Sequence, residues 1–139
     1  MLRENGHLVL IDIEGKRLET VSPAKARGML VVAGEGVETR VGDLSRLLEA
    51  APELGDQVVE AEWIGNRRWN LTFATGQHLA LPQGDDRAAG ALASFARLDG
   101  TNGLLGGRIA SFDMRSPERI YLRVPGRAEQ ARELQQEGT

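Results

Sequence analysis

The side chains that could hold a metal ion or act as a nucleophile are few in this chain of 139 residues. The two histidines, His7 and His78, have no partner near them at metal-ligand spacing, and two ligands are too few for a tetrahedral zinc site. Cysteine is absent, and no serine lies in the Gly-x-Ser-x-Gly turn that presents a nucleophile. We therefore expect no metal site and no nucleophilic catalysis.

Two pairs of carboxylates could serve in acid–base catalysis, but each has a simpler explanation. Asp12 and Glu14 stand where a predicted strand enters a turn, and Asp85 and Asp86 stand where a predicted helix begins. Solvation in the turn and capping of free N–H groups account for both pairs. The glycine-rich stretch 100–107 lacks the lysine that a phosphate-binding loop requires. We expect no enzymatic activity and no cofactor.

The last predicted strand, Arg119–Val124, has the composition of a protein interface. Its outer face carries Arg119, Tyr121 and Arg123, and both residue types are enriched at interfaces. The opposite face is apolar and should pack on the core, with Ile120, Leu122 and Val124. Because a strand close to a chain end can lie at a sheet edge, its unpaired backbone could recruit another chain. A plain solvated strand face would show the same pattern.

Nucleic-acid binding is not favoured. The chain carries a formal net charge of −3, and aromatic residues make up only 4% of it. Trp63 and Trp69 alternate with polar residues in predicted strands, which is typical of core residues rather than of base-stacking platforms. The hydrophobic content of 41% is sufficient for a core, and the length indicates one domain.

Two helices are predicted to position these groups. Asp43 should cap the first, whose apolar face is formed by Leu44, Leu47, Leu48 and Ala51. Asp85 or Asp86 should cap the second, whose apolar stripe is formed by Ala88, Ala91, Leu92, Phe95 and Leu98. A loop is expected at 99–103.

The remaining segments are predicted strands, at 7–13, 17–21, 29–33, 77–81, 109–115 and 119–124, with two more around a Gly65–Asn66 turn. In that hairpin the inward residues should be Val59, Ala61, Trp63, Trp69, Leu71 and Phe73. Strands that alternate with helices in this order predict an α+β fold, a mostly antiparallel sheet with two main helices packed on it. The domain should span residues 1–125, followed by a disordered tail at 126–139.

Four short runs occur in a recognisable order: LVLIDIEGK from Leu8, LVVAGEG from Leu30, RRWNL from Arg67 and FDMR…R.YLRV from Phe112. Together they resemble the periplasmic β domain of the FtsQ (DivIB) family of bacterial cell-division proteins, in its alphaproteobacterial form. Family members carry a membrane helix and a POTRA domain before this domain. The resemblance therefore implies that Met1 is not the natural N-terminus.

The resemblance implies a non-enzymatic scaffold of the division machinery, or divisome, on the periplasmic side of the inner membrane at the septum. Its partners would be FtsB and FtsL homologues, and other divisome proteins could join them. The partner would add a strand at the C-terminal edge and meet Arg115 with an acidic residue. The implied site comprises Arg115, Ser116, Glu118, Arg119, Ile120, Tyr121, Leu122, Arg123 and Val124. Pro117 lacks an N–H, so pairing should run along Glu118–Val124.

A second interpretation is a ligand-binding or envelope-assembly domain of the POTRA type found in outer-membrane assembly. It would use the same strand addition with different partners. A membrane anchor and one POTRA unit upstream would favour the division scaffold, whereas repeated POTRA units would favour the alternative. A small hydrolase is the remaining possibility, and activity that survives loss of Arg115 and the last strand would support it.

Overall fold

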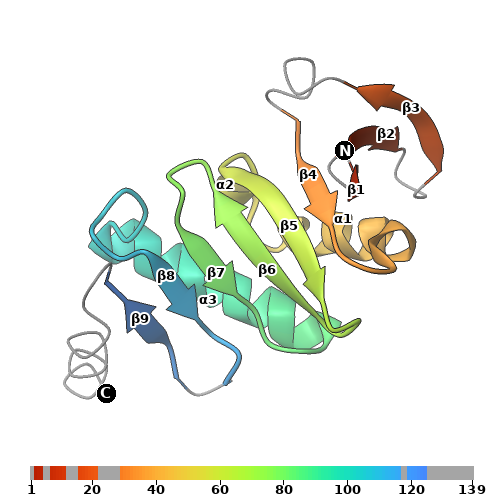
Figure 1. The fold of residues 1–139 in the computed structure, drawn as a ribbon. Coiled ribbons are helices and arrows are strands. Elements are labelled where there is room, and N and C mark those ends of the chain that lie inside the picture. Colours follow the sequence, from red (N-terminus) through yellow and green to blue (C-terminus); the bar gives the residue numbers. More distant parts are fainter. Residues whose placement is uncertain (1, 5–6, 12–15, 22–28, 117–118, 125–139) are drawn as a thin grey trace.

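The computed structural model describes residues 2–4, 7–11, 16–21, 29–116 and 119–124 (Figure 1). They form one sheet whose nine strands are β1 (Leu2–Glu4), β2 (His7–Ile11), β3 (Arg17–Val21), β4 (Val31–Ala33), β5 (Val58–Ile64), β6 (Arg68–Phe73), β7 (His78–Ala80), β8 (Ser111–Asp113) and β9 (Tyr121–Arg123). The helices are the 3-10 turn η1 (Val37–Arg40), α1 (Val41–Glu49), α2 (Pro52–Gly55) and α3 (Asp85–Asn102). The predicted tail lies outside the described residues.

The strand order is β3-β2-β1-β4-β5-β6-β7-β8-β9. Neighbours are antiparallel except at three pairs, β1–β4, β4–β5 and β7–β8. Parallel neighbours need a crossover connection, and the helices lie in two of these crossovers: η1, α1 and α2 between β4 and β5, and α3 between β7 and β8. Figure 1 shows α3 running along one face of β5–β8. The predicted α+β class is confirmed.

The β5–β6 hairpin forms the centre of the sheet. Gly65 and Asn66 both have positive φ angles, 60° and 56°, as their predicted turn requires. The two tryptophans face each other across it, with Trp63 aligned to Trp69 and ring centroids 4.9 Å apart. Both are buried, together with Leu71 and Phe73, so the predicted inward face of β6 is confirmed.

The start of β5 departs from the predicted alternation. The register shifts between Val58 and Glu60, as in a β-bulge. Val58 is consequently buried and Val59 is 41% exposed, although Val59 was predicted to share the inward face of Ala61. A bulge inserts one residue into the strand and reverses the faces before it, which strict alternation does not reveal.

Helix α1 begins earlier than predicted. It starts at Val41, directly after η1, and no side chain caps its N-terminus. Asp43 therefore lies in the first turn, where it pairs with Arg40 and Arg46, and the prediction that it caps the helix is wrong. The helix ends at Glu49, and Pro52 opens α2 after a break. Of the predicted apolar face, Leu44 and Leu47 are buried and Leu48 is half-buried, whereas Ala51 is buried but lies beyond the end of the helix.

Helix α3 is longer than predicted. Gly84 occupies the N-cap position without a side-chain cap, so the predicted capping by Asp85 or Asp86 is wrong, and both lie in the first turn. The helix continues through the predicted loop to Asn102, where Gly103 ends it with φ 62°. Among the helices that the structure describes, none has the length and apolar composition to cross a bilayer.

The buried stripe of α3 also differs from the prediction near its end. Ala88, Leu92 and Phe95 are buried as expected, but Leu98 is 37% exposed and Ala96 is buried instead. A helix turns by about 100° per residue, so a stripe centred on Leu92 includes position 96 and leaves out position 98.

Three phenylalanines connect the helix layer to the C-terminal strands. Phe95 of α3 stacks on Phe73 of β6, with ring centroids 5.7 Å apart, and meets Phe112 of β8 edge-on at 4.8 Å. All three are at most 1% exposed. This packing fixes β8 against the core and so positions the last hairpin.

Candidate partner-binding site

Strand β9 forms one edge of the sheet, opposite the edge formed by β3 (Figure 1). It spans Tyr121–Arg123, which is shorter than the predicted 119–124, and β8 spans Ser111–Asp113 rather than 109–115. Within the described part of the chain, β9 pairs only with β8. No other described strand pairs with its second side.

The β8–β9 ladder shows which backbone groups of β9 face outward. The carbonyl of Arg123 accepts a hydrogen bond from the N–H of Ala110 at 2.7 Å, so it is directed towards β8. Successive residues of a strand direct their backbone groups to alternate sides, and Tyr121 therefore shares this direction. Leu122 lies between them and directs its N–H and C=O to the outer edge. That pair can receive an added strand.

The side chains of β9 alternate between the two faces. Leu122 is aligned with the buried Phe112 and packs against the core together with Ile120. Tyr121 is aligned with Asp113 and Arg123 with Ser111, on the face away from the helices. Val124 is half-buried just beyond the strand, and Arg119 is exposed.

Arg115 is held by an acidic residue of this same chain. Its Nε donates to both carboxylate oxygens of Asp113 at 2.9 Å, and its Nη2 donates to Oδ2 at 2.5 Å. The backbone N–H of Arg115 also donates to Asp113, at 3.0 Å. The Arg115 side chain is nevertheless 57% exposed, so part of the guanidinium remains open to a second carboxylate.

The electrostatics of this pair follow from its geometry. Burial alone would raise the pKa of Asp113, but the hydrogen bonds from Arg115 and the positive charges of Arg115 and Arg68 outweigh burial and lower it below its ordinary value. The hydrogen bonds and negative charge of Asp113 raise the pKa of Arg115. Both groups are therefore charged at neutral pH.

Four residues of this region line an open cavity of about 490 Å³: Asp113, Arg115, Ser116 and Tyr121. The structure thus brings together Arg115, Ser116 and Tyr121 of the implied site and adds Asp113, which sequence reasoning missed. The sequence signal that could have identified Asp113 is its spacing from Arg115, because residues two apart in a strand share a face. Glu118 lies outside the described residues.

The chain matches a family model described as the C-terminal domain of cell division protein FtsQ/DivIB, over residues 1–115. It is 63% identical over 130 residues to cell division protein FtsQ of Novosphingobium aromaticivorans, covering 94% of this chain and 41% of that protein. The FtsQ of Zymomonas mobilis is 42% identical, and the match covers 81% of this chain and 35% of that protein. The FtsQ of Bradyrhizobium diazoefficiens is 33% identical, and the match covers 96% of this chain and 38% of that protein.

Strand β9 lies beyond the segment that the family model matches. The alignment with the Novosphingobium protein must include it, since 130 of the 139 residues are aligned. The chain spans about two fifths of the length of these relatives. The match over most of the chain shows that it belongs to the FtsQ/DivIB family of cell-division proteins.

Proposed function

We propose that this chain is a non-enzymatic scaffold domain that binds a divisome partner by strand addition at β9. The observation that carries the proposal is the outer edge of β9, which pairs with no other described strand and where the backbone of Leu122 faces outward beside the exposed guanidinium of Arg115. Added strands gain affinity from main-chain hydrogen bonds and specificity from neighbouring side chains.

The partner we propose is the periplasmic segment of an FtsB homologue, associated with FtsL. Family membership supports a role in division. The resemblance of the last hairpin to the family, which the alignment with the Novosphingobium protein includes, supports the choice of partner. In this proposal the domain lies on the periplasmic side of the inner membrane and links septal proteins. Other divisome proteins would use the rest of its surface.

Arg115 would fix the register of the added strand. Asp113 occupies Nε and part of Nη2, which orients the guanidinium and leaves Nη1 for a partner carboxylate. A guanidinium held in place loses less side-chain entropy on binding than a free one. Tyr121, half-buried beside it, would cover the contact from water.

The first test is calorimetric titration of the chain with the periplasmic segment of its own FtsB homologue. We expect binding by the wild type and none by Arg115→Glu, since that variant sets two carboxylates against the partner's acid. Arg108→Glu is the matched control, because Arg108 is exposed in the loop before β8 and carries the same charge change. Equal loss in both variants would indicate a general charge effect and contradict the proposed site.

A second test addresses the backbone. Leu122→Pro removes the outward N–H, whereas Leu122→Ala removes nearly the same side-chain packing and keeps the N–H. Proline is tolerated in an edge strand when its missing N–H faces outward. We expect Leu122→Pro to bind at least about tenfold more weakly than Leu122→Ala, because one hydrogen bond is worth roughly 1 kcal/mol and an unpaired partner carbonyl adds to the loss. Equal affinities of the two folded variants would exclude strand addition at this residue.

A further inference from the structure

The two edges of the sheet, β3 and β9, differ in how well they would accept another strand (Figure 1). In the β2–β3 pair the register shifts between Leu10 and Ile11, and the residue left without an aligned partner, Leu18, is 56% exposed. A bulge of this kind interrupts an edge and discourages pairing. The β8–β9 ladder is aligned without a shift, so β9 is the more regular edge.

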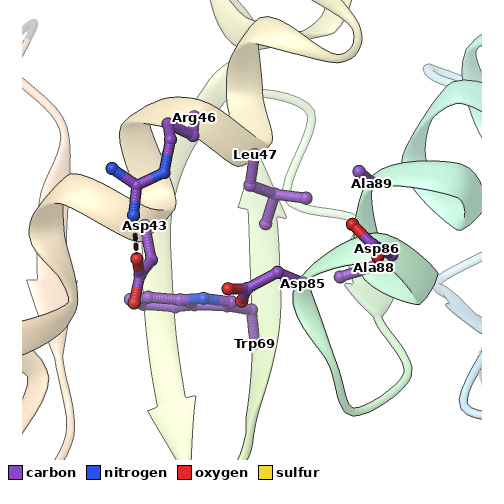
Figure 2. Close-up of a pocket in the computed structure, with 8 residues that line it drawn as sticks. All are labelled: Asp43, Arg46, Leu47, Trp69, Asp85, Asp86, Ala88 and Ala89. Atoms are coloured by element: carbon purple, nitrogen blue, oxygen red, sulfur yellow. Dashed lines mark hydrogen bonds and ion pairs between the residues drawn. The ribbon is translucent and has the colours of Figure 1, made fainter.

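The helical side of the sheet has a hollow, but its charges are largely paired within the chain. A cavity of about 300 Å³ lies between α1, β6 and the start of α3. Figure 2 shows Arg46 joined to Asp43 at its rim, with the ring of Trp69 edge-on beside them. This cavity offers another chain no unpaired strand backbone, whereas the edge of β9 does.

The backbone direction of β9 follows independently from the other side of β8. The carbonyl of Ala110 and the N–H of Met114, which flank β8, bond to β7 at 3.1 and 2.8 Å. Backbone groups alternate along a strand, so Ser111 and Asp113 direct theirs to β9. These two are aligned with the residues on either side of Leu122. The N–H and C=O of Leu122 therefore point away from β8.

The residues around Leu122 are complementary to themselves when the strand is reversed. In an antiparallel pair with a two-fold axis through Leu122, this residue lies opposite its own copy, and the two exchange both backbone hydrogen bonds. Tyr121 then lies opposite Arg123 of the second copy. Ile120 lies opposite Val124, which continues the apolar face that packs on the core. No arginine of β9 opposes an arginine.

The side-chain pairs created by this register are favourable. Both Tyr–Arg pairs fall at positions without mutual backbone bonds, where opposite side chains in an antiparallel sheet are closest. Within the described residues, the side chains of Tyr121 and Arg123 form no hydrogen bond or ion pair, so each is available to the other. A guanidinium over a phenol ring gains a cation–π interaction, as Arg40 over Trp63 does in this chain at 5.1 Å.

We infer that β9 pairs with β9 of a second copy of this chain, antiparallel and centred on Leu122, to form a two-fold dimer with one continuous sheet. A short strand makes a small contact, so the dimer is weak and forms at high local concentration. The same backbone groups bind the divisome partner in the proposed function, so self-pairing closes the edge until the partner displaces the second copy. This closure rests on the proposed function, whereas the self-pairing does not.

Cysteine cross-linking tests the register, because the chain contains no cysteine of its own. Tyr121→Cys and Arg123→Cys place thiols opposite each other across the two-fold axis, but neither opposite itself. We expect a mixture of the two variants to form disulfide-linked dimers at least about tenfold faster than either variant alone, since a disulfide needs Cα atoms roughly 4.4–6.8 Å apart. A mixture of Arg108→Cys and Tyr121→Cys is the control and should link no faster than its components.

Sedimentation equilibrium measures the dimer without cross-links. Leu122→Pro removes the N–H that both copies exchange, so it should dimerise at least about tenfold more weakly than Leu122→Ala. The inference is overturned if the cysteine mixture links no faster than the single variants, or if the two Leu122 variants dimerise alike. Wild-type assemblies larger than a dimer would indicate head-to-tail pairing of β9 with β3 and would also overturn it.

Competition separates the self-pairing from the proposed function. The periplasmic segment of the FtsB homologue should convert the wild-type dimer into a one-to-one complex as calorimetric saturation is approached. A segment that binds but leaves the dimer intact overturns the closure of the edge. A segment that does not bind contradicts the proposed function, while cross-linking and sedimentation still decide the self-pairing.

Discussion

At the scale of single residues, the pair of Asp113 and Arg115 explains how an exposed arginine can be positioned for recognition. Surface ion pairs contribute little to stability, typically under about 1 kcal/mol. A guanidinium that donates hydrogen bonds to both oxygens of a carboxylate is nevertheless fixed in orientation. The contribution of Asp113 is therefore to the geometry of Arg115 more than to the stability of the fold.

The pKa of Asp113 sets the pH range of this arrangement. This pKa is lower in the folded chain than in the unfolded chain, where it is about 3.9. The ionised Asp113 carboxylate therefore stabilises the fold fully above the unfolded pKa, and this stabilisation is lost as the pH falls through the folded pKa. We expect partner affinity to be constant from neutral pH to about 5 and to fall in more acidic solution. Titration of the Asp113 carboxyl by NMR, with Asp113→Asn as reference, checks the direction.

Tyr121 allows a second test at this scale. Tyr121→Asp sets a carboxylate directly opposite Asp113 on the outer face, which should cost roughly 1 kcal/mol or less in unfolding free energy. We expect the fold to remain and binding of the FtsB segment to be lost. Tyr121→Phe, which keeps the ring, should bind nearly as wild type. Unchanged binding by a folded Tyr121→Asp variant would place the interface elsewhere.

At the scale of elements, the loop between α3 and β8 depends on one buried polar side chain. Gln77 is 5% exposed. Its Nε2 donates to the carbonyls of Leu104 at 3.0 Å and Ile109 at 2.6 Å, and its Oε1 accepts from the N–H of Gly106 at 2.7 Å. A glutamine can satisfy donors and acceptors together, so this side chain holds the loop that leads into β8.

Replacing Gln77 should therefore disturb the last hairpin. Gln77→Leu leaves two carbonyls and one N–H without their partner, and each such loss costs about 1–3 kcal/mol if the group stays buried. We expect a loss of roughly 2–4 kcal/mol in unfolding free energy and faster amide exchange at 104–114. Thr75→Val removes only the hydroxyl that bonds Oε1 and should cost less. A loss of unfolding free energy for Gln77→Leu below this range would show that water replaces the hydrogen bonds of the Gln77 side chain.

The turn after β4 places Gly34 against β5. Its φ is 114°, and a Cβ there would lie only 2.2 Å from the carbonyl oxygen of Trp63. Gly34→Ala should therefore lower the unfolding free energy by more than about 3 kcal/mol, through backbone strain and a clash with rigid backbone. Gly36→Ala is the control. Its φ of 77° brings strain of about 1–2 kcal/mol, but its nearest neighbour would lie 3.8 Å away. Chemical denaturation measures both.

At the scale of the whole molecule, Trp69 joins the layers. It lies in the central strand β6, meets Trp63 across the hairpin and lines the cavity under α1 and α3. Trp69→Ala should cost about 3–5 kcal/mol in unfolding free energy, as large-to-small changes of buried aromatics do. The exposed Arg67→Ala serves as control and should change stability by at most about 0.5 kcal/mol. A loss near zero for Trp69→Ala would mean that the ring is not packed in solution.

The sequence by itself determined the α+β class, the turn and inward face of β6 in the central hairpin, and most of the apolar faces of both helices. These features depend on local periodicity and turn chemistry, which Trp69, Leu71, Phe73 and the Gly65–Asn66 turn express directly. Helix starts were less well predicted, because Asp43 and Asp85 carry the preference for a cap while the chain uses Arg40 and Gly84 at those positions.

Only the tertiary structure decided the bulge at Val58, the order of the strands and the partners of Arg115 and Trp69. Each depends on contacts between segments far apart in the chain or on a register that no local pattern encodes. For the same reason, only the fold showed that β9 ends the sheet of described strands, with the backbone N–H and C=O of Leu122 directed outward. It also brought α1, β6 and α3 together around a cavity that was not predicted from the sequence.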